Sequence, residues 1–377
     1  MTLFIFWFSI FYICYVYLGY PFILWSISKV KTIDHFITSD DWYRPYTTII
    51  ISMANESKDK IRQKISNTRY LMYTPLEVII ALDNPSTETK DFITEIIPPS
   101  WKMVSSDTSL GKEELQKMAV AASSDQSDIF VFTDVSSNLN SDAVLKLTQH
   151  FIDPLIGAVD GESKIVSENG LSSEGLYLRY ENKIRDLESK VGSLVTTGGC
   201  LFAIRKEIAD ELFSLPIQSD FGSALVSTSK GFRSVIETEA VATFQDLKNP
   251  SQEFSRKRRT VLRGMNTLWI MKSLLNPFRY GFFSFQLWSH KVMKWKVPFA
   301  LIAVLISNLF LFTPFYGLVL LGQFIFYLIA FMNVYGYPEN KLIKLITYFV
   351  SSNVAILFAW VDFLQGKNMR TWKFSER

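Results

Sequence analysis

Two acidic residues stand directly after largely apolar runs, a position suited to binding a charged ligand. Ile129–Phe132 leads into Thr133 and Asp134, and Leu76–Leu82 leads into Asp83. Such runs predict buried parallel strands, and open α/β sheets bind ligands beyond the carboxyl ends of their strands. A carboxylate without Cys or His beside it favours a hard divalent cation that carries phosphate, rather than zinc. Asp134 can equally cap the next turn, so other residues must decide.

Further polar residues are expected at the same edge. Thr47–Ile51 reads as a first strand, after which Asn55 and Glu56 open a helix. Another predicted helix runs from Gly111 and Lys112 through Ala122, and the Lys112 ammonium can reach a phosphate. Two strand-end acids and a lysine together predict a nucleotide pocket.

A second set of candidates lies in the later part of the chain. Gly198 and Gly199 precede Cys200 and an apolar strand, so they allow a backbone to approach something bound, although a simple turn would look the same. Asp220 opens a predicted helix that ends near Gly231. An acid there is either favoured by the helix dipole or a catalytic base, and the residue pattern alone favours the dipole.

Arg256–Arg259 is a basic cluster in an amphipathic stretch that contains Leu262, Met265 and Leu268. Such a stretch can lie in the membrane interface with its basic side chains reaching the headgroups. Its arginines can equally bind a substrate diphosphate, because the guanidinium fork suits phosphate oxygens.

These residues need a scaffold, and strands that alternate with helices predict a doubly wound α/β sheet. Gly157–Gly161 is expected to be an edge strand. The helix from Tyr177 to Lys190 carries charges at helical spacing, which predicts a solvated surface with a Glu181–Arg185 pair. The three histidines show no ligand spacing and are expected to be surface or structural residues.

The apolar residues gather at the two ends of the chain, which predicts membrane segments. The first 28 residues carry no charged side chain, and Lys29 and Lys31 follow, so we expect an uncleaved anchor with the next segment in the cytoplasm. No charge occurs from Val297 to Pro338, which is room for a hairpin of two spanning helices broken at Thr313-Pro314. The last run, 345–361, is expected to be interfacial or re-entrant.

The predicted organisation is an anchor at 1–30, a cytosolic catalytic domain at 45–250, interfacial helices at 251–296, and membrane helices with a basic tail at 297–377. The net charge of +3 gives no argument for nucleic acid as a partner. The two cysteines, Cys14 and Cys200, lie far apart and predict no disulfide framework.

Short fragments in a fixed order and spacing resemble a known family. They are Asn55-Glu56, Asp83 with Ser86-Thr87, Thr133-Asp134, Tyr180–Gly192, Gly198–Arg205, Asp220-Phe221, Gly231–Arg233, Arg256–Thr260, Ser289–Lys291 and Asn353–Lys367. The cytosolic part resembles the membrane-bound family 2 glycosyltransferases, which have a GT-A fold and include bacterial exopolysaccharide, chitin, cellulose and hyaluronan synthases.

The resemblance implies roles for individual residues. Asp83, with Asn55, Glu56 and Lys112, is expected at the nucleotide of a donor that is UDP-linked, and Asp134 with Ser136 is expected to hold Mg²⁺ or Mn²⁺. Asp220 is expected to be the general base, and Gly198, Gly199 and Cys200 to approach the acceptor. Arg256, Arg258 and Arg259 are expected to bind the diphosphate.

Two positions depart from the family pattern. Ser136 replaces the second acid of the metal motif, so phosphate oxygens and water must complete the octahedron. Thr260 replaces the tryptophan on which processive synthases stack the terminal sugar, which argues against long-chain processive synthesis.

The expected function is an inverting, metal-dependent transfer from a nucleotide sugar to a growing polysaccharide or a lipid-linked glycan at the cell membrane. The alternative is a non-catalytic nucleotide-sugar-binding or scaffold subunit of a polysaccharide synthesis or export complex. Other expected partners are the bilayer and an oligomeric or export partner. A transporter is poorly supported, because so few spans cannot form its usual repeats.

Overall fold

The apolar runs of the sequence form one eight-stranded sheet with the order β3-β2-β1-β4-β7-β6-β8-β5. The computed structural model describes residues 1–34, 42–166, 172–246, 250–334 and 340–367. The strands are β1 Thr47–Met53, β2 Leu76–Asp83, β3 Lys102–Ser106, β4 Ile129–Asp134, β5 Asn138–Leu139, β6 Ile156–Val166, β7 Leu201–Arg205 and β8 Arg233–Gln245. Strands β1 to β4 are parallel, whereas β7 runs antiparallel to β4 and β6. The sheet is therefore mixed.

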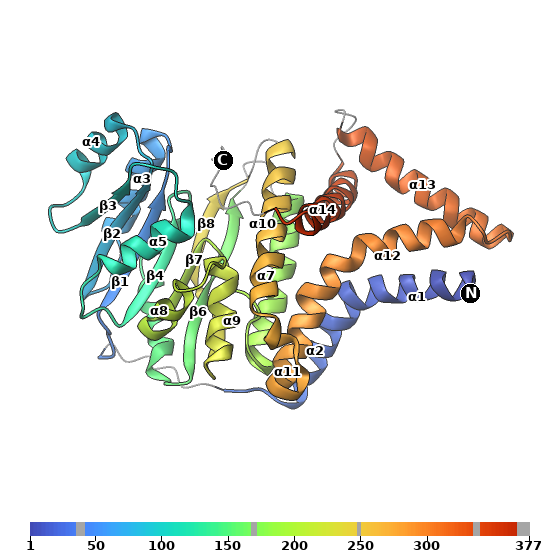
Figure 1. Ribbon diagram of the computed structural model, residues 1–377, viewed down its shortest axis with the longest axis horizontal. Coiled ribbons are helices and arrows are strands. Elements are labelled where there is room, and N and C mark those ends of the chain that lie inside the picture. Colours follow the sequence, from blue (N-terminus) through green and yellow to red (C-terminus); the bar gives the residue numbers. More distant parts are fainter. Residues whose placement is uncertain (35–41, 167–171, 247–249, 335–339, 368–377) are drawn as a thin grey trace.

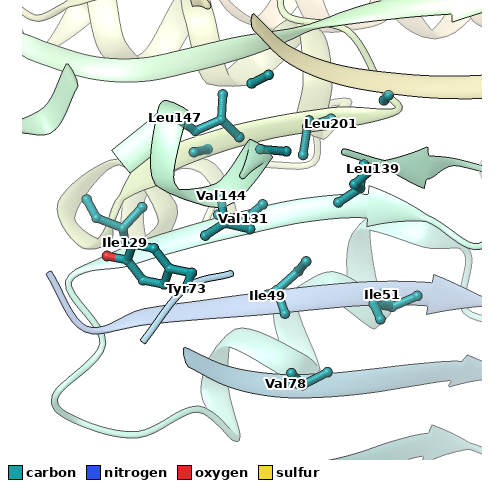
Figure 2. Packing of buried hydrophobic residues seen from close by; sticks show 14 of the residues in the cluster. Ile49, Ile51, Tyr73, Val78, Ile129, Val131, Leu139, Val144, Leu147 and Leu201 are labelled. Carbon is teal, nitrogen blue, oxygen red and sulfur yellow. The ribbon is translucent and has the colours of Figure 1, made fainter. Parts of the chain in front are cut away.

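Helices bury both faces of the sheet, so β1 is buried at every position and β4 at every position except Asp134. Ile49 and Ile51 of β1 pack into a core with α3 (Lys58–Arg69), α4 (Thr87–Ile96) and α6 (Ala143–Gln149). Figure 2 shows this core, in which Ile51, Val78 and Leu147 come from different elements. Ile50 points to the opposite core, which contains residues of α5 (Lys112–Ala121), α8 (Lys206–Leu212) and α9 (Ser219–Ser229).

Three local predictions differ from the structure. Residues 157–161 belong to β6, which is an internal strand between β7 and β8 and not an edge strand. A Cβ on Gly161 would lie 2.7 Å from the Leu201 side chain and 2.9 Å from the Ala240 carbonyl oxygen, so this glycine serves close packing. The first helix begins at Lys58 after an extended Ser57, which leaves Asn55 and Glu56 in the loop after β1. Strand β8 was not expected, because Glu237 and Glu239 interrupt its apolar pattern.

Long helices connect the sheet to the apolar ends of the chain. They are α1 Thr2–Cys14, the π-helical turn η1 Tyr15–Gly19, α2 Tyr20–Val30, α7 Ser173–Val191, α10 Pro250–Ile270, α11 Pro277–Leu287, η4 Trp288–Val292, α12 Met293–Asn308, α13 Pro314–Val334 and α14 Lys341–Leu364, with short 3₁₀ turns at His150–Ile152 (η2) and Lys272–Leu275 (η3). In Figure 1, α7, α9 and α10 stand between the sheet and the apolar helices, which extend to the side opposite β3.

Three helices of the described chain are long and apolar enough to cross a membrane: Thr2–Val30, Pro314–Met332 and Lys341–Leu364. Helix α12 has 16 residues and is not one of them, although it forms the predicted hairpin with α13 at the Thr313-Pro314 break. Helix α14 is longer than the apolar run 345–361. It lies between α10 and α13 in Figure 1 and contacts both helices, and the tail from residue 368 onward lies outside the described residues.

Candidate active site

The parallel strands bring the predicted acids to one edge of the sheet. β1 pairs with both β2 and β4, and its Ser52 lies opposite Asp134. The carboxyl ends of β2 and β4 therefore flank the end of β1, with Asp83 on one side and Asp134 on the other. Strand β7 begins beside β4, because Leu201 pairs with Thr133. The loop before β7, which contains the paired glycines, is thereby placed next to Asp134.

Asp83 holds the loop that leads into α5. Its buried carboxylate accepts hydrogen bonds from the backbone N–H groups of Leu110 at 2.8 Å and Gly111 at 3.3 Å, and from the Ser109 hydroxyl at 3.2 Å. Gly111 has a positive φ of 88°, which a residue with a side chain rarely adopts. Together these features fix the start of α5, where Lys112 is the first residue.

Lys112 lies at the centre of the site. Its ammonium contacts Asp134 Oδ1 at 2.5 Å and the Gly199 carbonyl oxygen at 3.3 Å. Burial alone would lower the pKa of Lys112, but Asp134 and Asp220 outweigh it and raise the pKa. A permanently charged cation therefore joins the acid at the end of β4 to the glycine loop, where a bound phosphate would be neutralised.

The structure also shows a lysine that the sequence did not suggest. Lys64 of α3 has no exposed surface, and its ammonium donates to Thr133 Oγ1 at 3.0 Å and to the Ser137 carbonyl oxygen at 2.6 Å. The Thr133 hydroxyl in turn donates to the Cys200 carbonyl oxygen at 3.0 Å. Burial lowers the pKa of Lys64 to about 7. Lys64 thus holds both ends of the turn that carries Asp134 and Ser136.

Glu56 and Asn55 lie in the loop after β1. The Glu56 carboxylate is almost fully buried and accepts the Ala54 N–H at 2.7 Å. Burial, with a smaller contribution from the charge of Asp134, raises the pKa of Glu56 to about 7. Asn55 is exposed. Glu56 therefore faces the same region as Asp134, whereas Asn55 lies on its solvent side.

The two glycines are required by space, since neither has a positive φ. The Gly198 N–H donates to Asp160 Oδ1 at 2.6 Å, and a Cβ there would lie 2.9 Å from Arg185 Nη1. A Cβ on Gly199 would lie 2.9 Å from Asp220 Oδ2. The pair therefore allows a close approach between the glycine loop and the charged groups of Arg185 and Asp220.

Asp220 lies in the first turn of α9, where the helix dipole favours its negative charge. Its Oδ1 accepts the Phe221 N–H at 2.7 Å, and its carbonyl oxygen accepts the Thr197 hydroxyl at 2.8 Å. Its Oδ2 faces Gly199. The two interpretations of Asp220 are thus compatible, because a dipole-stabilised carboxylate also reaches the centre of the site.

Arg185 and Glu188 of α7 are buried, whereas Arg179, Lys183 and Lys190 are exposed, so the prediction of a solvated helix holds for only one face of α7. Arg185 pairs with Asp160 of β6 rather than with Glu181. Glu188 accepts the Tyr20 hydroxyl at 2.5 Å and contacts His290 Nδ1 at 2.8 Å. His290 Nε2 contacts Glu181 at 3.1 Å, and Lys294 pairs with the same glutamate.

These pairs connect segments that are far apart in the sequence. They tie α7 to the N-terminal helix and to η4, which fixes the apolar helices against the catalytic domain. Burial alone would lower the pKa of His290, but Glu188 and Glu181 outweigh it and raise the pKa. His290 is buried, so it is not a surface residue.

A cavity of about 690 Å³ begins at Asp220 and the glycine loop. Its wall comes from α7, α10, η4, the start of α12, α14 and η1. Arg256 and Thr260 line it, whereas Arg258 binds Asp362 of α14 at 2.5 and 2.7 Å and does not line it. Of the three arginines in the basic cluster, Arg256 alone lines the cavity, where it pairs with Glu174.

Within the described residues, no three His, Cys, Asp or Glu side chains are grouped so that they could hold a metal ion by themselves. Asp134 is the partly exposed carboxylate at the sheet edge, with 24% of its side chain exposed. One carboxylate with open positions suits Mg²⁺ or Mn²⁺, which take their remaining oxygen ligands from substrate phosphates and water.

The chain was compared with known proteins. Residues 48–213 match the family described as Glycosyl transferase family 2. Comparison with curated proteins finds no match. The mannosyltransferase PcManGT from Pyrobaculum calidifontis, solved in complex with GDP-Man and Mn²⁺, superposes with a TM-score of 0.71 at 19% identity, over 96% of this chain and 99% of that chain. The glucosyl-3-phosphoglycerate synthase from Mycobacterium tuberculosis, in complex with Mn²⁺, UDP-Glc and phosphoglyceric acid, gives a TM-score of 0.41 at 16% identity, over 60% of this chain and 86% of that chain.

The first superposition shows that the fold is shared over nearly the whole chain, and it confirms the predicted GT-A type sheet. The match at residues 48–213 covers strands β1 to β7 and includes Asp83, Lys112 and Asp134. On these findings, residues 48–213 form a glycosyl transferase family 2 domain, and the protein is a glycosyltransferase.

Proposed function

We propose that this glycosyltransferase moves a sugar from a nucleoside-diphosphate sugar to a hydroxyl of a glycan acceptor, with inversion at the anomeric carbon. The observation that carries the proposal is the convergence of Asp134, Lys112, Gly199 and Asp220 at one edge of the sheet. This arrangement places a cation between the acid at the end of β4 and the acid at the start of α9.

The donor side of the site suits a diphosphate. Lys112 is free to exchange its contact with Asp134 for phosphate oxygens, since its ammonium reaches the open end of β4. Asp134, with Ser136 beside it, would hold Mg²⁺ or Mn²⁺, which would neutralise the leaving diphosphate. Asp83 supports this half by fixing the loop before Lys112, and Glu56 adds a second carboxyl beside Asp134. The solved relative PcManGT carries GDP-Man and Mn²⁺, which supports this class of donor.

The acceptor side of the site needs one base. The acceptor oxygen attacks the anomeric carbon, the bond from that carbon to the diphosphate oxygen breaks, and Asp220 takes the hydroxyl proton. Attack opposite the leaving group inverts the anomeric carbon in a single displacement. Thr260 has no ring on which a terminal sugar can stack, and we therefore propose transfer of one or a few sugars rather than long-chain synthesis.

The membrane placement belongs to the same proposal. Lys29 and Lys31 follow the first candidate span directly, so the positive-inside rule puts the catalytic domain in the cytoplasm. The three apolar helices then hold the Asp220 cavity at the bilayer surface.

The test is release of nucleoside diphosphate from UDP- and GDP-linked sugars by the full-length protein in detergent with Mn²⁺. We expect Asp220→Asn to lower release by roughly 10²-fold or more, as for loss of a general base, while nucleotide binding persists. The matched control is Asp210→Asn, an exposed acid of α8 outside the site. Equal release by the wild type and Asp220→Asn would contradict the role of Asp220.

A further inference from the structure

The cavity beside Asp220 carries an excess of positive charge. Besides His290, five lysine and arginine side chains and three acidic side chains line it: Arg185, Arg256, Lys257, Lys291 and Lys294, and Glu174, Glu181 and Asp220. Three of the cations have a carboxylate partner, because Arg185 pairs with Asp160, Arg256 with Glu174, and Lys294 with Glu181. The remaining two, Lys257 and Lys291, form no ion pair with any described residue.

Lys257 and Lys291 are held by neutral groups. The Lys257 ammonium donates to Ser352 Oγ at 2.5 Å and lies 3.7 Å from the centroid of the Tyr348 ring. Lys291 makes no hydrogen bond within the described chain, and its ammonium lies 5.2 Å from the centroid of the Phe221 ring. Phe221 follows Asp220 directly, so Lys291 stands beside the proposed base.

Two partly buried ammonium groups that line one cavity, each without a carboxylate in salt-bridge contact, favour the binding of an anion between them. Burial lowers the pKa of Lys257 to about 7 and that of Lys291 to about 8. Lys294 and His290 already share the carboxylate of Glu181. Glu253 near Lys257 and Asp220 near Lys291 act through their charge and form no ion pair with these lysines among the described residues. The chain therefore supplies two cationic contacts for an anionic group that it does not itself provide.

The wall of the cavity continues into the apolar helices. Tyr17 and Leu18 belong to the first candidate span, and Leu345, Phe349 and Ile356 belong to the third. A ligand that reaches from Asp220 past the two lysines would thus meet segments that can face lipid. Its chemistry is set by this sequence of contacts: a hydroxyl at the base, an anion in the middle and an apolar end.

We propose that the acceptor is a lipid-linked sugar whose hydroxyl faces Asp220 and whose phosphate or diphosphate linkage is bound by Lys257 and Lys291. The inference rests on the proposed function and names the acceptor class for the same site. Phosphate oxygens accept charge-assisted hydrogen bonds from both ammonium groups, and the lipid chain leaves along η1 and α14.

The experiment uses calorimetric titration of the full-length protein in detergent with three probes: farnesyl phosphate, farnesol and inorganic phosphate. The wild type is expected to bind farnesyl phosphate roughly tenfold or more tightly than either of the others, because only this probe joins the anion to an apolar chain. Equal binding of farnesyl phosphate and farnesol would overturn the phosphate contact. Equal binding of farnesyl phosphate and inorganic phosphate would overturn the lipid part.

The variants Lys257→Met and Lys291→Met are each expected to weaken farnesyl phosphate binding roughly tenfold or more and to leave farnesol binding unchanged. Lys291→Arg should restore binding, which a folding defect would not allow. The matched control is Lys117→Met, an exposed lysine of α5. Undiminished binding by both methionine variants would overturn the assignment. If farnesyl phosphate fails to bind while sugar transfer still depends on Asp220, this inference fails and the proposed function stands.

Discussion

Replacement of Gly199 by alanine should disable the base without unfolding the protein. The added Cβ would lie 2.9 Å from Asp220 Oδ2, and the next nearest atom is Asp220 Cγ at 3.8 Å. Since ordinary contacts begin near 3.4 Å, the carboxylate must move by about 0.5 Å. A misplacement of this order in a reacting group lowers the rate roughly tenfold to a hundredfold.

The assay is the initial rate of sugar transfer or nucleoside-diphosphate release, with nucleotide affinity and thermal midpoint measured on the same samples. Gly199→Ala should lower the rate and leave the other two quantities unchanged, because the only crowded group is one flexible side chain. Gly322→Ala in α13 is the control, since a Cβ there meets nothing within 4 Å.

A double variant makes the test specific to Asp220. In the Asp220→Asn background, Gly199→Ala should cause little further loss of rate, because both changes act on the same carboxylate. Full activity of Gly199→Ala, or an additive loss in the double variant, would refute the reasoning.

Two further predictions concern the buried contacts between the catalytic domain and the apolar helices. Arg258→Met leaves the buried carboxylate of Asp362 with Lys367 alone. We therefore expect the free energy of unfolding to fall by about 1–3 kcal/mol and the thermal midpoint to fall with it. The control is Arg62→Met, which removes an exposed ion pair and should leave the midpoint unchanged. His290 has a raised pKa in the folded protein, so its contribution to stability is complete below the unfolded pKa and is lost as the pH rises through the folded value. Unfolding midpoints from pH 5 to 9 should fall for the wild type, and a His290→Gln variant that falls equally would contradict this.

The acids at the edge of the sheet could be predicted because the pattern that indicates them lies within a few residues of the chain. Asp83 and Asp134 directly follow buried apolar runs, and parallel pairing alone brings the ends of such runs together. The glycine pair and the acid at the start of α9 were also visible as patterns within a few residues. The roles of these residues came from the family resemblance, because their spacing in the sequence does not indicate which reaction they carry out.

Contacts between distant segments could not be predicted in this way. The helix pattern of 177–190 suggested pairs four residues apart, whereas Arg185 pairs with Asp160 and Glu188 contacts both Tyr20 and His290. Lys64 gave no signal, because a lysine on a short amphipathic helix ordinarily faces solvent. The Lys64 ammonium donates hydrogen bonds to Thr133 and Ser137, on either side of Asp134. These contacts arise only when α3 packs on the sheet, so no local pattern in the sequence indicates them.

The most direct measurement is calorimetric titration of UDP and GDP in the presence of Mn²⁺, with the wild type and Asp134→Ala. The account predicts that the wild type binds one of these nucleotides only when Mn²⁺ is present, and that Asp134→Ala loses this dependence, whereas Lys117→Ala on the surface of α5 retains it. Unchanged, Mn²⁺-dependent affinity in Asp134→Ala would contradict the assignment of the donor site to the edge of the sheet.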